Sequence, residues 1–281
     1  MKFNLLAPAW ALSLMVAITN AGAIAQPPRL ADDDREKVYQ KYWAGLSINS
    51  TSDSPLSAIS GVIHVPKFFP PSKGDKANIS FVIHWGTSGM CGAAASAGID
   101  MKIRNDGKAD LAAWTHASHD DGLDIASVHW LDEMRGKRFD IIPGDEVTVT
   151  IKAIDRRSVW IFWKNARTGD HEQLLLGDYN VDLCTSWAAW VTERRPGEMA
   201  DSSGDWSRIP DFGTSVLKDM QWGTEDAKVW NAGERKGPAK EKWHIVGKND
   251  GWGEYVNLRC NFFNDSPDIT PEGMECTQIT H

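Results

Sequence analysis

The feature of this sequence that most constrains its fold is a series of short β-type runs separated by glycine and proline. Clear examples are residues 60–65, ended by Pro66, and residues 79–85 and 187–192. These runs are rich in β-branched and aromatic residues, while glycine and proline between them favour turns. No long segment keeps the 3.6-residue apolar period of a helix, although residues 123–134 fit either a short helix or a covering loop. The pattern predicts an all-β protein built as a sandwich or barrel of antiparallel strands.

Further strands are expected in the middle and near the end of the chain. Residues 139–142 and 147–153 read as two strands joined by a Pro143-Gly144-Asp145 turn, and residues 158–164 as another. Beyond Gly233 the sequence is polar and glycine-rich, and it returns to a strand at residues 255–263.

The N-terminus has the pattern of an export signal. Lys2 precedes an apolar run at residues 5–18, and Ala23-Ile24-Ala25 supplies the small-x-small pattern read by signal peptidase. The run is short for a membrane span, which needs about 20 apolar residues; the alternative is an uncleaved anchor. We therefore expect a signal peptide at residues 1–25, a short leader or loose arm at 26–41, a single β-sandwich domain at 42–281, and a secreted, extracellular protein.

Charge and cysteine content narrow the function. The chain has a formal net charge of −8, which argues against nucleic acid or an anionic membrane as a partner. Its four cysteines suggest two disulfides in an exported protein, with three connectivities open. Their spacing fits no zinc site, and we expect no metal and no cofactor. Asn49 and Asn78 begin Asn-x-Ser/Thr motifs and are candidate glycosylation sites.

Fourteen tryptophans are an unusual number for a chain of this length. Tryptophan gives a large rigid contact area and an N–H donor, which suits a groove for a glycan, a peptide or a flat apolar molecule. The alternative is that a large sandwich core uses these rings as filler. We therefore expect a monomeric protein with a concave cleft that binds a polypeptide or a small molecule.

Several short motifs, in order and at similar spacing, resemble the eqolisins, a family of exported glutamic endopeptidases. The resemblance covers roughly residues 43–217. Its motifs are Tyr42-Trp43-Ala44-Gly45, Ser60-Gly61 with Val65-Pro66, Gly144-Asp145, Asn165-Ala166-Arg167-Thr168-Gly169, the segment from Leu183-Cys184 to Glu193, and Ile209-Pro210-Asp211-Phe212-Gly213.

This resemblance implies a fold and a mechanism. The fold is a concanavalin-like sandwich of two antiparallel sheets, bent so that one concave face holds a peptide. The family's glutamate takes a proton from water and returns it to the leaving amine, while a glutamine amide donates to the oxyanion. Glu193 occupies the position of that glutamate. Strand alternation places it on one face with Trp187, Ala189 and Val191. The alternative is a solvated surface glutamate beside Arg194 and Arg195.

The family's glutamine is not matched. One alignment places Ser96 at the glutamine position and His116 at a cleft glutamate, whereas a rival alignment with a longer insertion places His116 at the glutamine position. Three interpretations stay open. Ser96, His116 and Glu193 form a rebuilt site with a serine nucleophile and a histidine base; Glu193 is the base and His116 donates to the oxyanion; or both residues line a cleft that no longer cleaves peptides.

Other residues enter through the same resemblance. Trp43, Asp100, Trp114 and Trp187 are expected to contact the substrate. Cys91 and Cys184 lie near the family's paired positions, which leaves Cys260 with Cys276.

The 30 Lys and Arg residues stay positive when the carboxylates are neutralised. Such self-repulsion destabilises a compact fold in acid, so we expect any activity nearer neutral pH.

Overall fold

The structure, a computed structural model, describes residues 36–40, 43–67, 77–86, 92–103, 108–118, 127–130, 139–177, 181–193, 212–226, 228–232, 240–249, 254–263 and 273–278. These residues form strands, turns and connecting segments, with no helix among them. In this part of the chain there is accordingly no helix long and apolar enough to cross a membrane.

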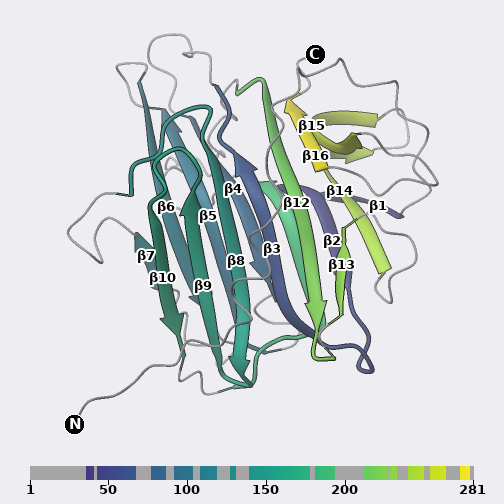
Figure 1. The fold of residues 1–281 in the computed structure, drawn as a ribbon. Coiled ribbons are helices and arrows are strands. Elements are labelled where there is room, and N and C mark those ends of the chain that lie inside the picture. The colour runs from purple at the N-terminus through teal and green to yellow at the C-terminus, as the bar shows by residue number, and fades with distance from the viewer. Residues whose placement is uncertain are drawn as a thin grey trace.

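The strands form one hydrogen-bonded path that folds into two facing layers (Figure 1). The first layer has the order β10-β9-β8-β3-β12-β16 and the second the order β14-β2-β11-β4-β5-β6-β7, with β15 joining them between β16 and β14. Among the strands that the structure describes, all pairings are antiparallel except that of β1 with β14. The predicted all-β, two-sheet sandwich is therefore confirmed.

The first layer and its attachments comprise β3 (Leu56–His64), β8 (Glu146–Asp155), β9 (Ser158–Asn165), β10 (His171–Leu176), β12 (Thr214–Thr224), β13 (Val229–Asn231) and β16 (Gly273–Gln278). The second comprises β1 (Glu36–Gln40), β2 (Trp43–Asn49), β4 (Ala77–Trp85), β5 (Ala94–Ile103), β6 (Ala109–Ser118), β7 (Ser127–Trp130), β11 (Trp187–Glu193) and β14 (Lys240–Asn249). The connecting strand β15 spans Glu254–Phe263.

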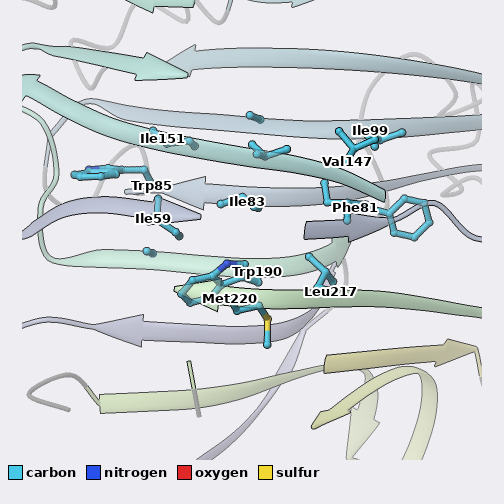
Figure 2. Packing of buried hydrophobic residues seen from close by; sticks show 14 of the residues in the cluster. Ile59, Phe81, Ile83, Trp85, Ile99, Val147, Ile151, Trp190, Leu217 and Met220 are labelled. Atoms are coloured by element: carbon cyan, nitrogen blue, oxygen red, sulfur yellow. The ribbon is translucent and has the colours of Figure 1, made fainter. Parts of the chain in front are cut away.

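The main core lies between the two layers. Figure 2 shows alternate residues of β4 there, Phe81, Ile83 and Trp85, together with Val147 and Ile151 of β8. All five side chains are fully buried. Because strand residues alternate between faces, the residues between them on β4 lie on the opposite, outer side of the second layer.

Trp190 fixes β11 against the first layer. Its indole Nε1 donates to the backbone carbonyl of Ser60 at 2.8 Å, and a Cβ atom on Gly61 would lie 3.1 Å from the indole. A glycine in β3 thus leaves room for the ring to cross from the other layer. With Trp190 turned inward, its neighbours Ala189 and Val191 are turned outward.

The segment before the Pro143-Gly144-Asp145 turn differs from the strand expected there. Residues 139–142 form no strand. Instead Asp145 accepts a hydrogen bond from the Ile142 amide at 3.0 Å, and Asn165 donates to the Asp140 carbonyl at 2.8 Å. These side-chain contacts satisfy backbone groups that a strand ladder would otherwise pair, while Phe139 packs on Trp163. The prediction of a strand at 139–142 was therefore wrong.

Two other local predictions also need correction. Within 123–134, residues Ser127–Trp130 form strand β7, which pairs with β6, rather than a helix or loop. The glycine-rich tail after Gly233 contains β14, which the sequence interpretation did not include. Both strands form because they pair with a neighbouring strand, and the residue pattern of one segment does not show which strand will be its neighbour.

The cysteine prediction is supported where the structure describes it. Cys260 and Cys276 are directly opposite each other on β15 and β16 and form a disulfide. Cys184 is also disulfide-bonded. Cys91 lies outside the described residues.

Candidate active site

The outer face of the second layer carries the predicted site residues. On β11 this face presents Trp187, Ala189, Val191 and Glu193, because Ala188 and Trp190 belong to the core between the layers. The predicted arrangement of these four residues on one face is thus observed. On the neighbouring strands the same alternation directs Ser80, Val82 and His84 of β4, and Ser96, Gly98 and Asp100 of β5, to this side of the layer.

Two rows of polar residues cross this outer face. In the first row His84 of β4 is opposite Ser96 of β5, which is opposite His116 of β6. In the second row Glu193 of β11 is opposite Ser80 of β4, which is opposite Asp100 of β5. Val191 and Val82 lie opposite each other between the two rows.

Three of these side chains form a hydrogen-bonded line, which we call the polar triplet: Ser96, His84 and Glu193. The Ser96 hydroxyl oxygen lies 2.7 Å from His84 Nδ1, and His84 Nε2 lies 3.2 Å from a carboxylate oxygen of Glu193. His84 and Glu193 come from different rows, so their side chains reach toward each other over Val82 and Val191. The side chains of His84 and Glu193 are 21% and 15% exposed, and Ser96 is 5% exposed. The triplet is therefore shielded but reaches the surface.

Two tryptophans lie beside the triplet. Trp43 and Trp187 meet edge to face with ring centroids 6.1 Å apart, and the His84 ring lies 6.3 Å from Trp187. Both tryptophans pack on an apolar cluster made of Val82, Trp114, Ala189 and Val191. The polar groups thus stand beside a largely apolar surface, where electrostatic interactions are stronger than in water.

Gly98 leaves the space that the ring of Trp114 occupies. A Cβ atom at residue 98 would lie 2.9 Å from the indole Cζ2 of Trp114 and 2.7 Å from the Phe81 carbonyl. The absence of a side chain at this position lets the ring of Trp114 lie close to β5, directly between Ser96 and Asp100 along the strand. Trp114 is 2% exposed, so it forms the floor of the site.

The structure brings together some of the predicted site residues and separates others. Glu193 and Ser96 are linked, but the imidazole between them belongs to His84. His116 is next to Ser96 in the first row, on the side away from Glu193. Asp100 is buried and accepts a hydrogen bond from the Ser80 hydroxyl. Arg194 and Arg195, the alternative partners of Glu193, lie outside the described residues.

Sequence reasoning missed His84. The strand at residues 79–85 was predicted, and strand alternation alone places His84 on one face with Val82 and Ser80. The missing information was the pairing of β4 between β11 and β5, which sets His84 between Glu193 and Ser96. The described residues contain no group of three side chains that could hold a metal ion.

Comparison with known families identifies the fold that carries this site. A model of the Peptidase A4 family matches residues 41–237, which is more than half of the chain. The chain belongs to the Peptidase A4 family. Its resemblance to the eqolisins is thereby confirmed. A search of curated protein sequences found no match.

Solved structures of this family share the fold. Scytalido-glutamic peptidase with a peptide-based transition-state analogue is 14% identical, with a TM-score of 0.58, and the match covers 85% of this chain and 99% of that one. SCP-B, an eqolisin solved with the tripeptide Ala-Ile-His, gives the same values. Aspergilloglutamic peptidase from Aspergillus niger is 16% identical over 72% of this chain and 99% of that one, with a TM-score of 0.52.

Proposed function

We propose that this member of the Peptidase A4 family is an exported endopeptidase that hydrolyses peptide bonds on the outer face of its second layer, with Glu193 as the general base. The observation that carries the proposal is the contact of Glu193 with an imidazole and, through it, with a hydroxyl. Glu193 is also the residue that the family resemblance assigns as the base. Titratable groups that touch one another in a partly shielded site are candidates for acid–base work.

The chemistry requires a group that takes a proton from the nucleophile and returns it to the leaving amine. The Glu193 carboxylate meets the first requirement when it is ionised. His84 Nε2, 3.2 Å away, is a second group that can hold the same proton or donate to the oxyanion. The 30 Lys and Arg residues stay positive in acid and repel one another, which supports action nearer neutral pH than in strong acid.

The substrate in this proposal is a polypeptide. Solved relatives have been crystallised with a peptide-based transition-state analogue and with a tripeptide. Trp43 and Trp187, packed over the buried ring of Trp114, supply rigid apolar area beside Glu193, and such area favours contacts with apolar side chains of a peptide. Export is supported by the signal-like residues 1–25 and by the Cys260–Cys276 disulfide.

A second function is favoured by a different observation. Trp43 and Trp187 approach to 6.1 Å across the outer face, and this aromatic pair would also suit a flat apolar small molecule or a glycan. In that case the chain is a repurposed binding protein or small-molecule enzyme of the same family.

The deciding experiment is digestion of a denatured protein by the purified mature chain from about pH 3 to pH 8. We expect cleavage, and we expect Glu193→Ala to reduce its rate by about 100-fold or more, the usual range for loss of a general base. Glu225→Ala, an exposed glutamate in a turn, is the matched control and should cleave like the wild type.

Absence of cleavage at every pH, from a folded sample with its disulfides intact, would contradict the peptidase proposal. The binding function would then be tested by quenching of tryptophan fluorescence with apolar ligands and oligosaccharides.

A further inference from the structure

The hydrogen-bond partners of His84 define which of its nitrogens carries a proton. An ionised carboxylate only accepts hydrogen bonds, so the contact with Glu193 requires a proton on Nε2. In a neutral imidazole Nδ1 then has a free lone pair, and the Ser96 hydroxyl must donate to it at 2.7 Å. This is the resting arrangement of a serine that is ready to lose its proton to a base.

We propose that Ser96 is a nucleophile, that His84 is its general base, and that hydrolysis passes through an acyl ester on Ser96. This inference rests on the proposed function for its peptide substrate, but the nucleophile itself is testable without one. From the proposed function it keeps only the site and the peptide substrate. The general base is here His84, which lies outside the sequence-predicted set, in place of Glu193, and water no longer attacks the peptide directly.

The order of contacts is that of a Ser-His-acid triad with the two ring nitrogens exchanged. In the familiar serine proteases the hydroxyl meets Nε2 and the carboxylate meets Nδ1. Here Ser96 is directly opposite His84 on the adjacent strand β5. On the other side, Ala189 of β11 is opposite His84, and Glu193 lies four residues further along β11. The nearer nitrogen, Nδ1, therefore meets Ser96, and the ring tip reaches Glu193. Either nitrogen of a neutral imidazole can act as the base when the other is protonated.

The reaction balances without any further reagent. Ser96 Oγ bonds to the carbonyl carbon as its proton passes to His84 Nδ1. The C–N bond then breaks, and the leaving amine takes that proton. Water attacks the resulting ester and gives a proton to Nδ1, after which the C–Oγ bond breaks and Oγ regains the proton. Glu193 stays ionised throughout and stabilises the imidazolium, so in this route it is a positioning residue.

The oxyanion must be stabilised by side chains in this site. Ser96 lies in the interior of β5, which is paired on both sides with β4 and β6. The backbone N–H groups of such a strand are used by the two ladders. His116, directly opposite Ser96 on β6, leaves the sheet on the same face and is the nearest candidate donor by register.

The test uses a small alkyl fluorophosphonate on the full mature protein. Attack by Ser96 forms a P–O bond and expels fluoride, leaving a mass increment that peptide mass spectrometry assigns to a residue. We expect label on Ser96 and none in Ser96→Ala. We expect the labelling rate to fall about 100-fold or more in His84→Ala and to stay at the wild-type value in His171→Ala, whose histidine lies on β10 in the other layer.

Glu193→Gln provides a readout that a merely structural role would not move. The amide still accepts the hydrogen bond from Nε2 but carries no charge to stabilise the imidazolium. The curve of labelling rate against pH should therefore shift along the pH axis relative to that of the wild type. Loss of folded protein would instead lower the rate by the same factor at every pH.

The outcomes separate this inference from the proposed function. Label on Ser96 without peptide cleavage supports the nucleophile and removes the peptidase. Cleavage with no label on Ser96 overturns the nucleophile and leaves Glu193 acting on water. The inference is also overturned if the folded protein takes no label, or if the labelling rate is the same in His84→Ala as in the wild type.

Discussion

Each layer of the sandwich contains a carboxylate held by hydrogen bonds, and the two sites differ in their donors. In the first layer, the Asp145 cluster consists of Asp145, Arg167, Asn165 and the Ile142 amide. Asp145 is 3% exposed and receives bonds of 2.6 and 3.1 Å from Arg167, 2.7 Å from Asn165 and 3.0 Å from the amide. In the second layer, Glu193 meets the imidazole of His84 at 3.2 Å.

The difference separates a structural site from the proposed active site. Burial alone raises the pKa of the Asp145 carboxyl, but the hydrogen bonds from Arg167, Asn165 and Ile142 outweigh burial and hold that pKa below its ordinary value. None of these donors releases a proton near neutral pH, so the Asp145 cluster stays fixed. A neutral imidazole, in contrast, has a free ring nitrogen that can accept a proton. The polar triplet can therefore transfer protons, while the Asp145 cluster pins β8 and β9 together.

The largest predicted effect comes from giving the polar triplet a fixed donor. In His84→Gln the side-chain amide can still donate to Glu193, as Asn165 does to Asp145, but it cannot take a proton. If His84 is the base, peptide hydrolysis should fall by about 100-fold or more. Initial rates on a fluorogenic peptide, with circular dichroism to confirm folding, measure this effect.

Retention of most of the activity in His84→Gln would show that the imidazole acts only as a hydrogen-bond donor. The water route with Glu193 as base would then be preferred. His171→Gln serves as the matched control, because it makes the same change on the exposed edge strand β10.

The second prediction makes the corresponding change in the Asp145 cluster. In Asp145→Asn the carboxylate becomes an amide whose NH₂ group must face donors from Arg167 and Asn165. We expect a loss of about 2–3 kcal/mol in the free energy of unfolding, less than for a fully buried ion pair because Arg167 is partly exposed. The midpoint of urea unfolding measures this loss. Activity per folded molecule should not change, and a fall comparable to that of His84→Gln would contradict the structural role.

The same variant has a distinct acid dependence. Because the pKa of Asp145 is lower in the folded state, its contribution to stability is present above its ordinary pKa of about 3.9 and is lost as the pH falls through the folded value. The gap in urea midpoint between wild type and Asp145→Asn should therefore narrow below about pH 4. A gap that stays constant in acid would show that the charge of Asp145 is not what the cluster stabilises.

The turns that carry the Asp145 cluster were recognised from the sequence, whereas the polar triplet was recognised only in part. Gly144-Asp145 and Asn165 to Gly169 are local turn motifs, and their residues meet because β8 and β9 are consecutive strands. These motifs were recognised, but residues 139–142 were interpreted as a strand. An apolar run does not reveal that its backbone groups will form hydrogen bonds with side chains instead of with a neighbouring strand. Strands β3, β4, β9 and β11 were predicted within a few residues of their bounds, because each has an uninterrupted β-type run.

The polar triplet depends on strand order instead. Alternation placed Glu193 correctly on a face with Trp187, and the family resemblance brought Ser96 into the candidate set. His84 joins them only because β4, distant in sequence from β11, lies between β11 and β5. A single sequence records the period of each strand but not its neighbours. The histidine among the candidate residues was therefore His116, taken from the family alignment, which lies on the far side of Ser96.

The smallest predicted effect tests whether the aromatic residues beside the polar triplet belong to its function. Trp187→Ala removes a ring that contacts both Trp43 and His84. One lost aromatic contact is worth about 1 kcal/mol, so KM for an apolar peptide should rise about fivefold while kcat changes less. Trp160→Ala, a 49% exposed ring on β9 in the other layer, should leave KM unchanged. An unaltered KM in Trp187→Ala, with kcat lowered instead, would mean that Trp187 positions His84 rather than the substrate, and the aromatic pair would then belong to the catalytic chemistry.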